Sequence, residues 1–203
     1  IKCMEQQIKN NKIILKNVLS DEHFKSIMDT ILSDRFPWFY QNHVVYEEQA
    51  TAEEKYQIQF VHKFHENSNI ATSPEIWNMC FPIFAVLQPH TFLRVKANNI
   101  PGRETIVTHG MHCDVSVPLS YTAIFYCNTN NGFTEFKDGD KVPSVANSMV
   151  IFPSHMEHTG STCSDERCRV NININFVADW NNQLLKPISP QGSESINKLW
   201  CKI

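Results

Sequence analysis

The residues of this chain with the clearest chemical potential are His112, Asp114 and His158. Two neutral imidazoles and one carboxylate form the facial ligand set that holds a non-haem Fe(II) ion and leaves its other positions open. The spacing of the first pair has a physical reason, because residues i and i+2 of a β-strand point to the same face. A strand over THGMHCD would present His112 and Asp114 together and turn Cys113 away, so we expect Cys113 to be a buried spectator.

The first half of the chain supplies predicted supporting elements for such a site. Ser20 is a favourable N-cap for a helix that continues to residue 32, and the acidic residues after it suit the positive end of a helix. Ser73 and Pro74 begin a second predicted helix, which runs through residue 87 with a kink at Pro82. Predicted strands occupy residues 12–19, 39–46 and 56–65.

After residue 90 the chain changes to short strands separated by turns such as Asn131-Gly132. Helices followed by a run of strands predict an α+β, mainly β fold with a sandwich or barrel flanked by N-terminal helices. The length predicts a single domain over 1–203. Within it we expect a helical and strand support over 1–90, a strand core over 91–178 and a surface tail over 179–203. Predicted strands occupy residues 91–99, 104–114, 120–128, 132–136, 147–154 and 167–177, and the segments 46–56 and 98–104 are candidate lids by position.

The last predicted strand alternates cleanly between polar and apolar residues, which is the pattern of a strand with two different faces. Its polar face either looks at solvent or lines a polar, ligand-filled barrel. Lys96 and Asn98 present the same two alternatives. The polar face carries Arg169, Asn171, Asn173 and Asn175, and the apolar face carries Val170, Ile172, Ile174 and Phe176.

Composition and charge exclude several classes of function. With 18 basic and 21 acidic residues, the net charge of −3 gives no electrostatic reason for tight binding to nucleic acid. No apolar run is long enough to span a bilayer, and no secretory signal pattern is present. The seven scattered cysteines match no zinc motif or disulfide framework, which favours reduced thiols in a cytoplasm. A loop disulfide between Cys163 and Cys168 is the less favoured alternative.

Further motifs follow HCD in a fixed order: IFYCN, NGFTEF, VIFP, His158 and Arg169. Over residues 94–178 this order resembles the dioxygenases that use Fe(II) and 2-oxoglutarate, in particular the prolyl-hydroxylase-like branch. The resemblance implies a double-stranded β-helix (jelly-roll, cupin-like) core flanked by N-terminal helices. Segments such as FPWFYQNHVV and DGDKVPSVAN resemble a family of such oxygenases encoded by marine phages. That narrower resemblance implies a host cytoplasm as the location.

The resemblance implies a role for each matched residue. His112, Asp114 and His158 would bind iron. Arg169 would hold the distal carboxylate of 2-oxoglutarate, because a guanidinium presents a fork that fits a carboxylate. Tyr126 either donates its hydroxyl to the same carboxylate or only packs its ring in the core. The other matched positions are Thr134 and Phe136 in the hairpin beside the cofactor, and Asn171, which contacts 2-oxoglutarate or substrate or belongs to a plain polar lining.

Two of these assignments compete with a neighbour of the same type. The family places its distal histidine five positions after the proline of FP, which selects His158 over His155. Arg169 is preferred to Arg167 because it directly precedes the alternating strand and shares the inward face with Asn171.

The implied reaction is hydroxylation of a C–H bond, coupled to conversion of 2-oxoglutarate and O2 to succinate and CO2, with ascorbate as a candidate accessory reductant. Related halogenases leave the carboxylate position to chloride, so Asp114 favours hydroxylation. The expected substrate is a peptidyl proline or another protein side chain, and a free amino acid, nucleobase or other metabolite is the alternative. From other classes, a non-oxidative cupin-like metal-binding protein and an inactive jelly-roll binding protein remain alternatives.

Overall fold

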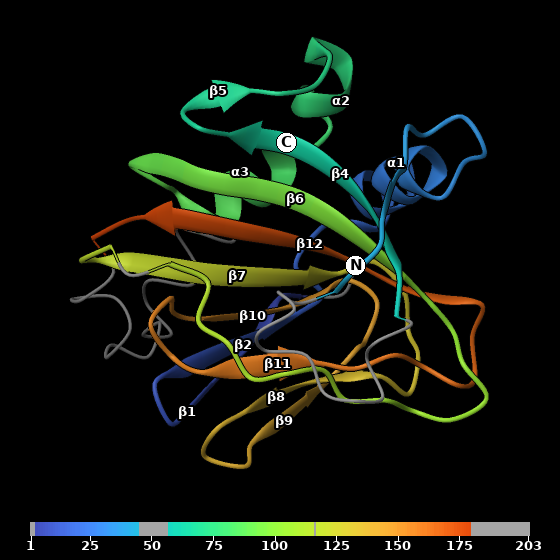
Figure 1. The fold of residues 1–203 in the computed structure, drawn as a ribbon. Helices are drawn as coiled ribbons and strands as arrows, with labels where there is room; N and C mark the ends of the chain where they lie inside the picture. Colours follow the sequence, from blue (N-terminus) through green and yellow to red (C-terminus); the bar gives the residue numbers. More distant parts are fainter. Residues whose placement is uncertain (1–2, 45–56, 116, 180–203) are drawn as a thin grey trace.

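The computed structural model describes residues 3–44, 57–115 and 117–179. Its strands form two antiparallel sheets (Figure 1). The large sheet has the order β1-β2-β10-β7-β12-β6-β4-β3 with β5 added to β4, and the small sheet has the order β11-β8-β9. The strands are β1 (Glu5–Lys9), β2 (Lys12–Lys16), β3 (Phe39–Gln41), β4 (Gln59–Glu66), β5 (Asn69–Ile70), β6 (Thr91–Pro101), β7 (Ser120–Tyr126), β8 (Phe133–Phe136), β9 (Lys141–Pro143), β10 (Ser148–Pro153), β11 (His158–Gly160) and β12 (Cys168–Val177).

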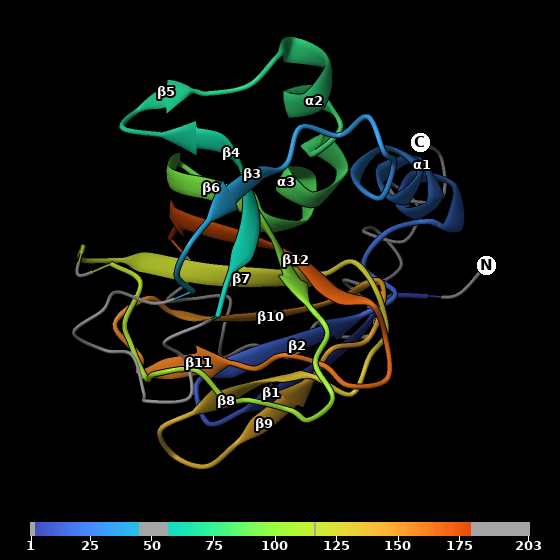
Figure 2. The same ribbon diagram turned by 45° about the vertical axis from the view of Figure 1, so that its right-hand side comes forward.

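Three helices pack on the face of the large sheet that is turned away from the small sheet (Figures 1 and 2). They are α1 (Asp21–Ile31), α2 (Pro74–Asn78) and α3 (Phe81–Leu87). The predicted N-cap of α1 is confirmed, since the Ser20 hydroxyl accepts a hydrogen bond from the backbone N–H of His23. None of these helices, nor any other in the described ranges, has the length and apolarity to cross a membrane.

The main hydrophobic core fills the space between the helices and the large sheet. On β12 the apolar face predicted from the alternation contributes Val170, Ile172, Ile174 and Phe176, all at most 1% exposed. A second, smaller cluster lies between the sheets and includes Tyr126, Phe136 and Phe152. The polar face of β12 is thereby turned towards the space between the two sheets.

The prediction of one kinked helix over residues 74–87 is wrong. Helix α2 ends at Asn78 and α3 begins at Phe81, so the chain forms two short helices. In a continuous helix the ring of Pro82 would clash with the carbonyl of Asn78. At the second position of α3 the missing N–H of proline leaves no hydrogen bond unmade.

The predicted strand over residues 104–114 is also wrong. This segment forms only isolated bridges, between Thr108 and Ser161 and between His112 and His158. Its neighbour β11 forms its three-residue ladder with β8 instead. The preceding strand β6 extends instead to Pro101, which places most of the candidate lid 98–104 inside the large sheet.

Other differences lie at the edges of the molecule. The all-exposed strand β1 was not predicted, and the strand predicted over 39–46 ends at Gln41 within the described residues. The candidate lid over 46–56 and nearly all of the tail over 179–203 lie outside those residues.

Lys12 carries a charge into the interior beside the second cluster. Its side chain is 1% exposed, its Nζ lies 2.5 Å from Asp138 and 3.1 Å from Asp140, and it sits 4.7 Å from the centroid of the Phe136 ring. Removing one partner of a buried ion pair leaves the charge of the other partner uncompensated. The two aspartates that would remain here are partly exposed, so the cost is smaller than for a fully buried pair. We expect Lys12→Met to lower the free energy of unfolding by about 2 kcal/mol in a urea titration. Lys9→Met, at the exposed lysine on Asp140, should change it much less, and equal effects would contradict this account.

Candidate active site

His112, Asp114 and His158 come together as predicted. Each offers a ligand atom, and these atoms all lie within 4.8 Å of one another. The rings of His112 and His158 are 4.7 Å apart between centroids, and Nε2 of His158 lies 3.6 Å from Oδ2 of Asp114. The backbones of the two histidines exchange reciprocal N–H to carbonyl hydrogen bonds of 2.9 Å. This one bridge, not a continuous strand, positions the ligand set.

The two imidazoles are oriented for metal binding through Nε2. The Nδ1 atom of His112 lies 3.2 Å from the carbonyl oxygen of Gly110, and Nδ1 of His158 lies 3.0 Å from that of Met156. A hydrogen bond to a carbonyl keeps the proton on Nδ1 and leaves the Nε2 lone pair free. Burial lowers the pKa of His158, which favours the neutral form that a metal requires.

Asp114 is held as a carboxylate by hydrogen bonds from four neighbours, the longest of them from Asn173 Nδ2 to Oδ2 at 3.5 Å. Arg94 Nη2 donates to its Oδ1 at 2.8 Å, while Thr122 Oγ1 and Asn175 Nδ2 donate to its Oδ2 at 3.0 Å and 3.1 Å. Burial by itself raises the pKa of Asp114, but His158, Arg94 and the other neighbours lower it to about 2. The donor set therefore fits a divalent metal, with one anionic oxygen and two neutral nitrogens. The supporting roles of Arg94, Thr122 and Asn175 were not predicted.

Asn175 is the supporting residue that is easiest to test. It is fully buried, donates also to Thr122 Oγ1 at 2.9 Å and accepts from Arg94 Nε at 3.0 Å. Partners that orient a metal ligand typically contribute 10–100-fold to metal affinity. We therefore expect Asn175→Ala to weaken Fe(II) binding about tenfold in anaerobic calorimetry. The control is Asn69→Ala on exposed β5, and an unchanged affinity in a folded Asn175 variant would refute the role.

Arg169, which the sequence favoured over Arg167, has a side chain that is only 2% exposed, whereas Arg167 is exposed. Its Nε donates to Ser144 Oγ at 2.7 Å and its Nη2 to Thr134 Oγ1 at 3.2 Å. Burial lowers the pKa of Arg169, and its interactions with the described residues include no carboxylate. A buried guanidinium in these surroundings is suited to receive an anion.

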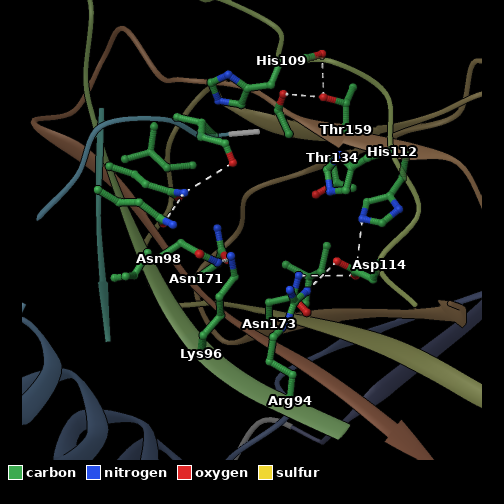
Figure 3. A pocket seen from close by; sticks show the side chains of 18 of the residues that line it. Arg94, Lys96, Asn98, His109, His112, Asp114, Thr134, Thr159, Asn171 and Asn173 are labelled. Carbon is green, nitrogen blue, oxygen red and sulfur yellow. Dashed lines mark hydrogen bonds and ion pairs between the residues drawn. The ribbon is translucent and has the colours of Figure 1, made fainter. Parts of the chain in front are cut away.

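One pocket of about 260 Å³ is lined by the three candidate ligands and by Arg169. Figure 3 shows this pocket, with His112 and Asp114 among the labelled residues. Thr134 also lines it, as do Asn171 and Asn173 of β12, which are 4% and 8% exposed. Of the two alternatives for the polar face of β12, the lining of an internal site is therefore confirmed. Lys96 and Asn98 also line the pocket, and Asn98 donates to Asn171 at 2.9 Å.

The contact of Tyr126 with 2-oxoglutarate stays a prediction, and the structure shows where its ring and hydroxyl lie. Its side chain is fully buried in the cluster between the sheets, and it does not line the pocket. Its hydroxyl donates to Thr134 Oγ1 at 2.8 Å, and its ring lies 5.7 Å from the Arg169 guanidinium carbon. Tyr126 thus positions the residues around the guanidinium.

The sequence predictions for three cysteines and for His155 have different outcomes. Cys113 is exposed and lines the pocket, with its thiol donating to the carbonyl of His155, so the prediction of a buried spectator is wrong. The error follows from the missing strand over 104–114. Cys163 and Cys168 are free thiols, as favoured. His155 is exposed and outside the ligand set.

Comparison with solved structures identifies the fold. No model of a known protein family matches the chain, and no curated protein matches it in sequence. A Trichoplax adhaerens prolyl hydroxylase, solved with a peptide fragment of the hypoxia inducible factor oxygen degradation domain, has a TM-score of 0.59 at 10% identity, covering 88% of this chain and 89% of that one. An oxidoreductase of the 2OG-Fe(II) oxygenase family from Burkholderia pseudomallei gives 0.58 at 10% identity, over 82% and 85%.

A third similar structure is the non-haem α-ketoglutarate-dependent carbocyclase SnoK from nogalamycin biosynthesis, with a TM-score of 0.58 at 11% identity over 87% of each chain. These matches confirm the predicted fold, a mainly β jelly-roll core with few helices. They do not reach the phage-encoded branch, which stays a prediction.

Proposed function

We propose that this protein is an Fe(II)- and 2-oxoglutarate-dependent dioxygenase that hydroxylates a C–H bond. One observation carries the proposal: the buried Arg169 guanidinium and the His112, Asp114 and His158 ligand set share a single pocket. A non-oxidative cupin-like protein would need the metal ligands alone and would have no use for a carboxylate anchor. The same fold in solved 2-oxoglutarate-dependent enzymes supports the assignment by analogy.

Each residue has a defined task in this proposal. His112, Asp114 and His158 would hold Fe(II) through two neutral nitrogens and one carboxylate oxygen. Arg169 and Thr134 would receive the distal carboxylate of 2-oxoglutarate, and the hydrogen bond from Arg169 to Ser144 keeps the guanidinium aimed into the pocket. When bound, the iron and 2-oxoglutarate supply the oxidation of substrate by O2, with release of succinate and CO2.

For the substrate we propose a peptidyl proline or another protein side chain, with a small metabolite as the second candidate. The Trichoplax prolyl hydroxylase of similar fold was solved with a peptide, which supports the first. The carbocyclase SnoK, from nogalamycin biosynthesis, keeps the second open. The mild acidity of the chain weighs against nucleic acid as a partner.

Anaerobic spectroscopy tests the proposal without a known substrate. Addition of Fe(II) and 2-oxoglutarate should produce a metal-to-ligand charge-transfer band in the visible range, and Fe(II) alone should not. His112→Ala should lose the band, because only two of the three ligands remain. A native protein without the band, or an unchanged band in the variant, would show that the pocket does not hold the pair as proposed.

A further inference from the structure

We propose that the pocket binds its substrate through an anionic group, a carboxylate or a phosphate, held by Lys96. The inference rests on the proposed function and extends it, because it assigns a substrate class to the part of the pocket that the metal and 2-oxoglutarate leave open. Lys96 lines this pocket from the middle of β6 (Figure 3).

The strand register places Lys96 in a polar row across three neighbouring strands. It pairs with Asn173 of β12 on one side and with Lys63 of β4 on the other. Side chains of directly paired residues share one face of a sheet, and all three line the pocket. Two lysines directly opposite each other repel, which is unfavourable unless an anion lies between or beside them.

The other cations beside Lys96 already have partners. Arg94 forms an ion pair with Asp114 at 2.8 Å, and Lys63 forms one with Glu66 at 2.7 Å. No ion pair or hydrogen bond joins the Lys96 ammonium to another of the described residues. Burial, with Arg94 nearby, lowers the pKa of Lys96 to about 8. The ammonium is thus held in the pocket at a cost that a bound anion would offset.

Two buried amide oxygens beside Lys96 add detail to the expected ligand. Oδ1 of Asn98 and Oδ1 of Asn173 accept no hydrogen bond within the described part of the chain. Both residues line the pocket and are less than 10% exposed. A substrate with N–H or O–H donors next to its anionic group would satisfy these acceptors together with Lys96.

The position of Lys96 separates its anion from that of 2-oxoglutarate. Arg169 pairs with Ile100, whereas Lys96 pairs with Asn173, four residues further along β12. At about 3.3 Å per residue, the two backbone positions are roughly 13 Å apart. A five-carbon diacid held by Arg169 and reaching the metal ligands leaves Lys96 available for a second anion.

Protection from chemical labelling tests this site with defined probes. Protein loaded with Fe(II) and 2-oxoglutarate without oxygen is treated with a neutral acetylating reagent at pH 8, and the acetylation rate of each lysine is measured by peptide mass spectrometry. The probes are acetate, methylphosphonate and acetamide at constant ionic strength. We expect at least one of the two anions, at a few times its dissociation constant, to slow acetylation of Lys96 about fivefold. Acetamide should have no effect, and the exposed Lys25 of α1 should react equally in every sample.

The two anions distinguish the source of the charge, since protection by acetate indicates a carboxylate substrate and protection by methylphosphonate a phosphorylated one. Absence of protection by both anions would overturn the anion site. Full protection by 2-oxoglutarate alone, compared with protein lacking it, would also overturn it by placing Lys96 in the 2-oxoglutarate site. The Lys96→Met variant should keep the charge-transfer band with unchanged 2-oxoglutarate affinity. A native protein without the band overturns the proposed function, whereas a band without protection of Lys96 overturns only this inference.

Discussion

Replacing His158 with alanine is expected to lower Fe(II)- and 2-oxoglutarate-dependent succinate release by at least about a hundredfold. His158 is the most buried of the three proposed ligands, at 2% exposed, and Phe152 packs on its ring at 4.7 Å between centroids. A hundredfold loss is the upper end of what removal of an orienting partner does, so loss of a ligand itself should reach it. The measurements are succinate release and the iron content of the purified variant.

His155→Ala is the matched control for this experiment. His155 lies three positions before His158, is exposed, and contributes only its backbone carbonyl to Cys113. It should keep full iron content and full succinate release. If the two variants behaved alike, or if the His158 variant retained its iron, the ligand set would have to be reassigned.

The polar face of β12 was predictable from the sequence because its signal is local. Strict alternation from Arg169 onwards fixes which side chains share a face, whatever the strand packs against. The apolar residues then had to face a core, and Arg169 with the asparagines had to face either solvent or a site. The structure turns that face inward because the small sheet covers it.

The support of Asp114 was not predictable, because it depends on register between distant strands. Arg94 lies directly opposite Asn175 in the pairing of β6 with β12. Both side chains donate hydrogen bonds to the Asp114 carboxylate. No local pattern encodes that register. The nearest signal in the sequence is the even spacing of Arg94 from Lys96 and Asn98, which favours one shared face on a strand.

For the segment that ends at Asp114, the predicted proximity of His112 and Asp114 is correct, but the predicted strand that was its reason is not. Alternation predicted that His112 and Asp114 would lie together on a strand, yet residues 104–114 form only isolated bridges. Long-range hydrogen bonds between His112 and His158 bring the ligands together instead. Cys113 is exposed at the pocket for the same reason, since no continuous sheet turns it inward.

Replacing Arg169 with methionine is expected to raise the KM for 2-oxoglutarate by about tenfold to a hundredfold while leaving Fe(II) affinity unchanged. A hydrogen bond to a charged group contributes about 1.5–3 kcal/mol, and each 1.4 kcal/mol corresponds to tenfold in affinity. Arg169→Lys should fall between the native protein and Arg169→Met, because an ammonium keeps the charge but loses the planar fork. The measurements are succinate release as a function of 2-oxoglutarate concentration and Fe(II) binding in anaerobic calorimetry.

Arg167→Met is the control for position, because Arg167 lies two residues earlier in the chain and is exposed. Its KM should equal that of the native protein. Arg169 also donates to Ser144 and Thr134, so its loss lowers stability as well, and thermal unfolding has to be measured on the same samples. A folded Arg169→Met variant with a lower melting temperature but a native KM would show that the guanidinium only joins β12 to its neighbours. The carboxylate anchor of 2-oxoglutarate would then have to be another cation of the pocket, and Lys96, whose ammonium forms no ion pair with the described residues, would be the first to test.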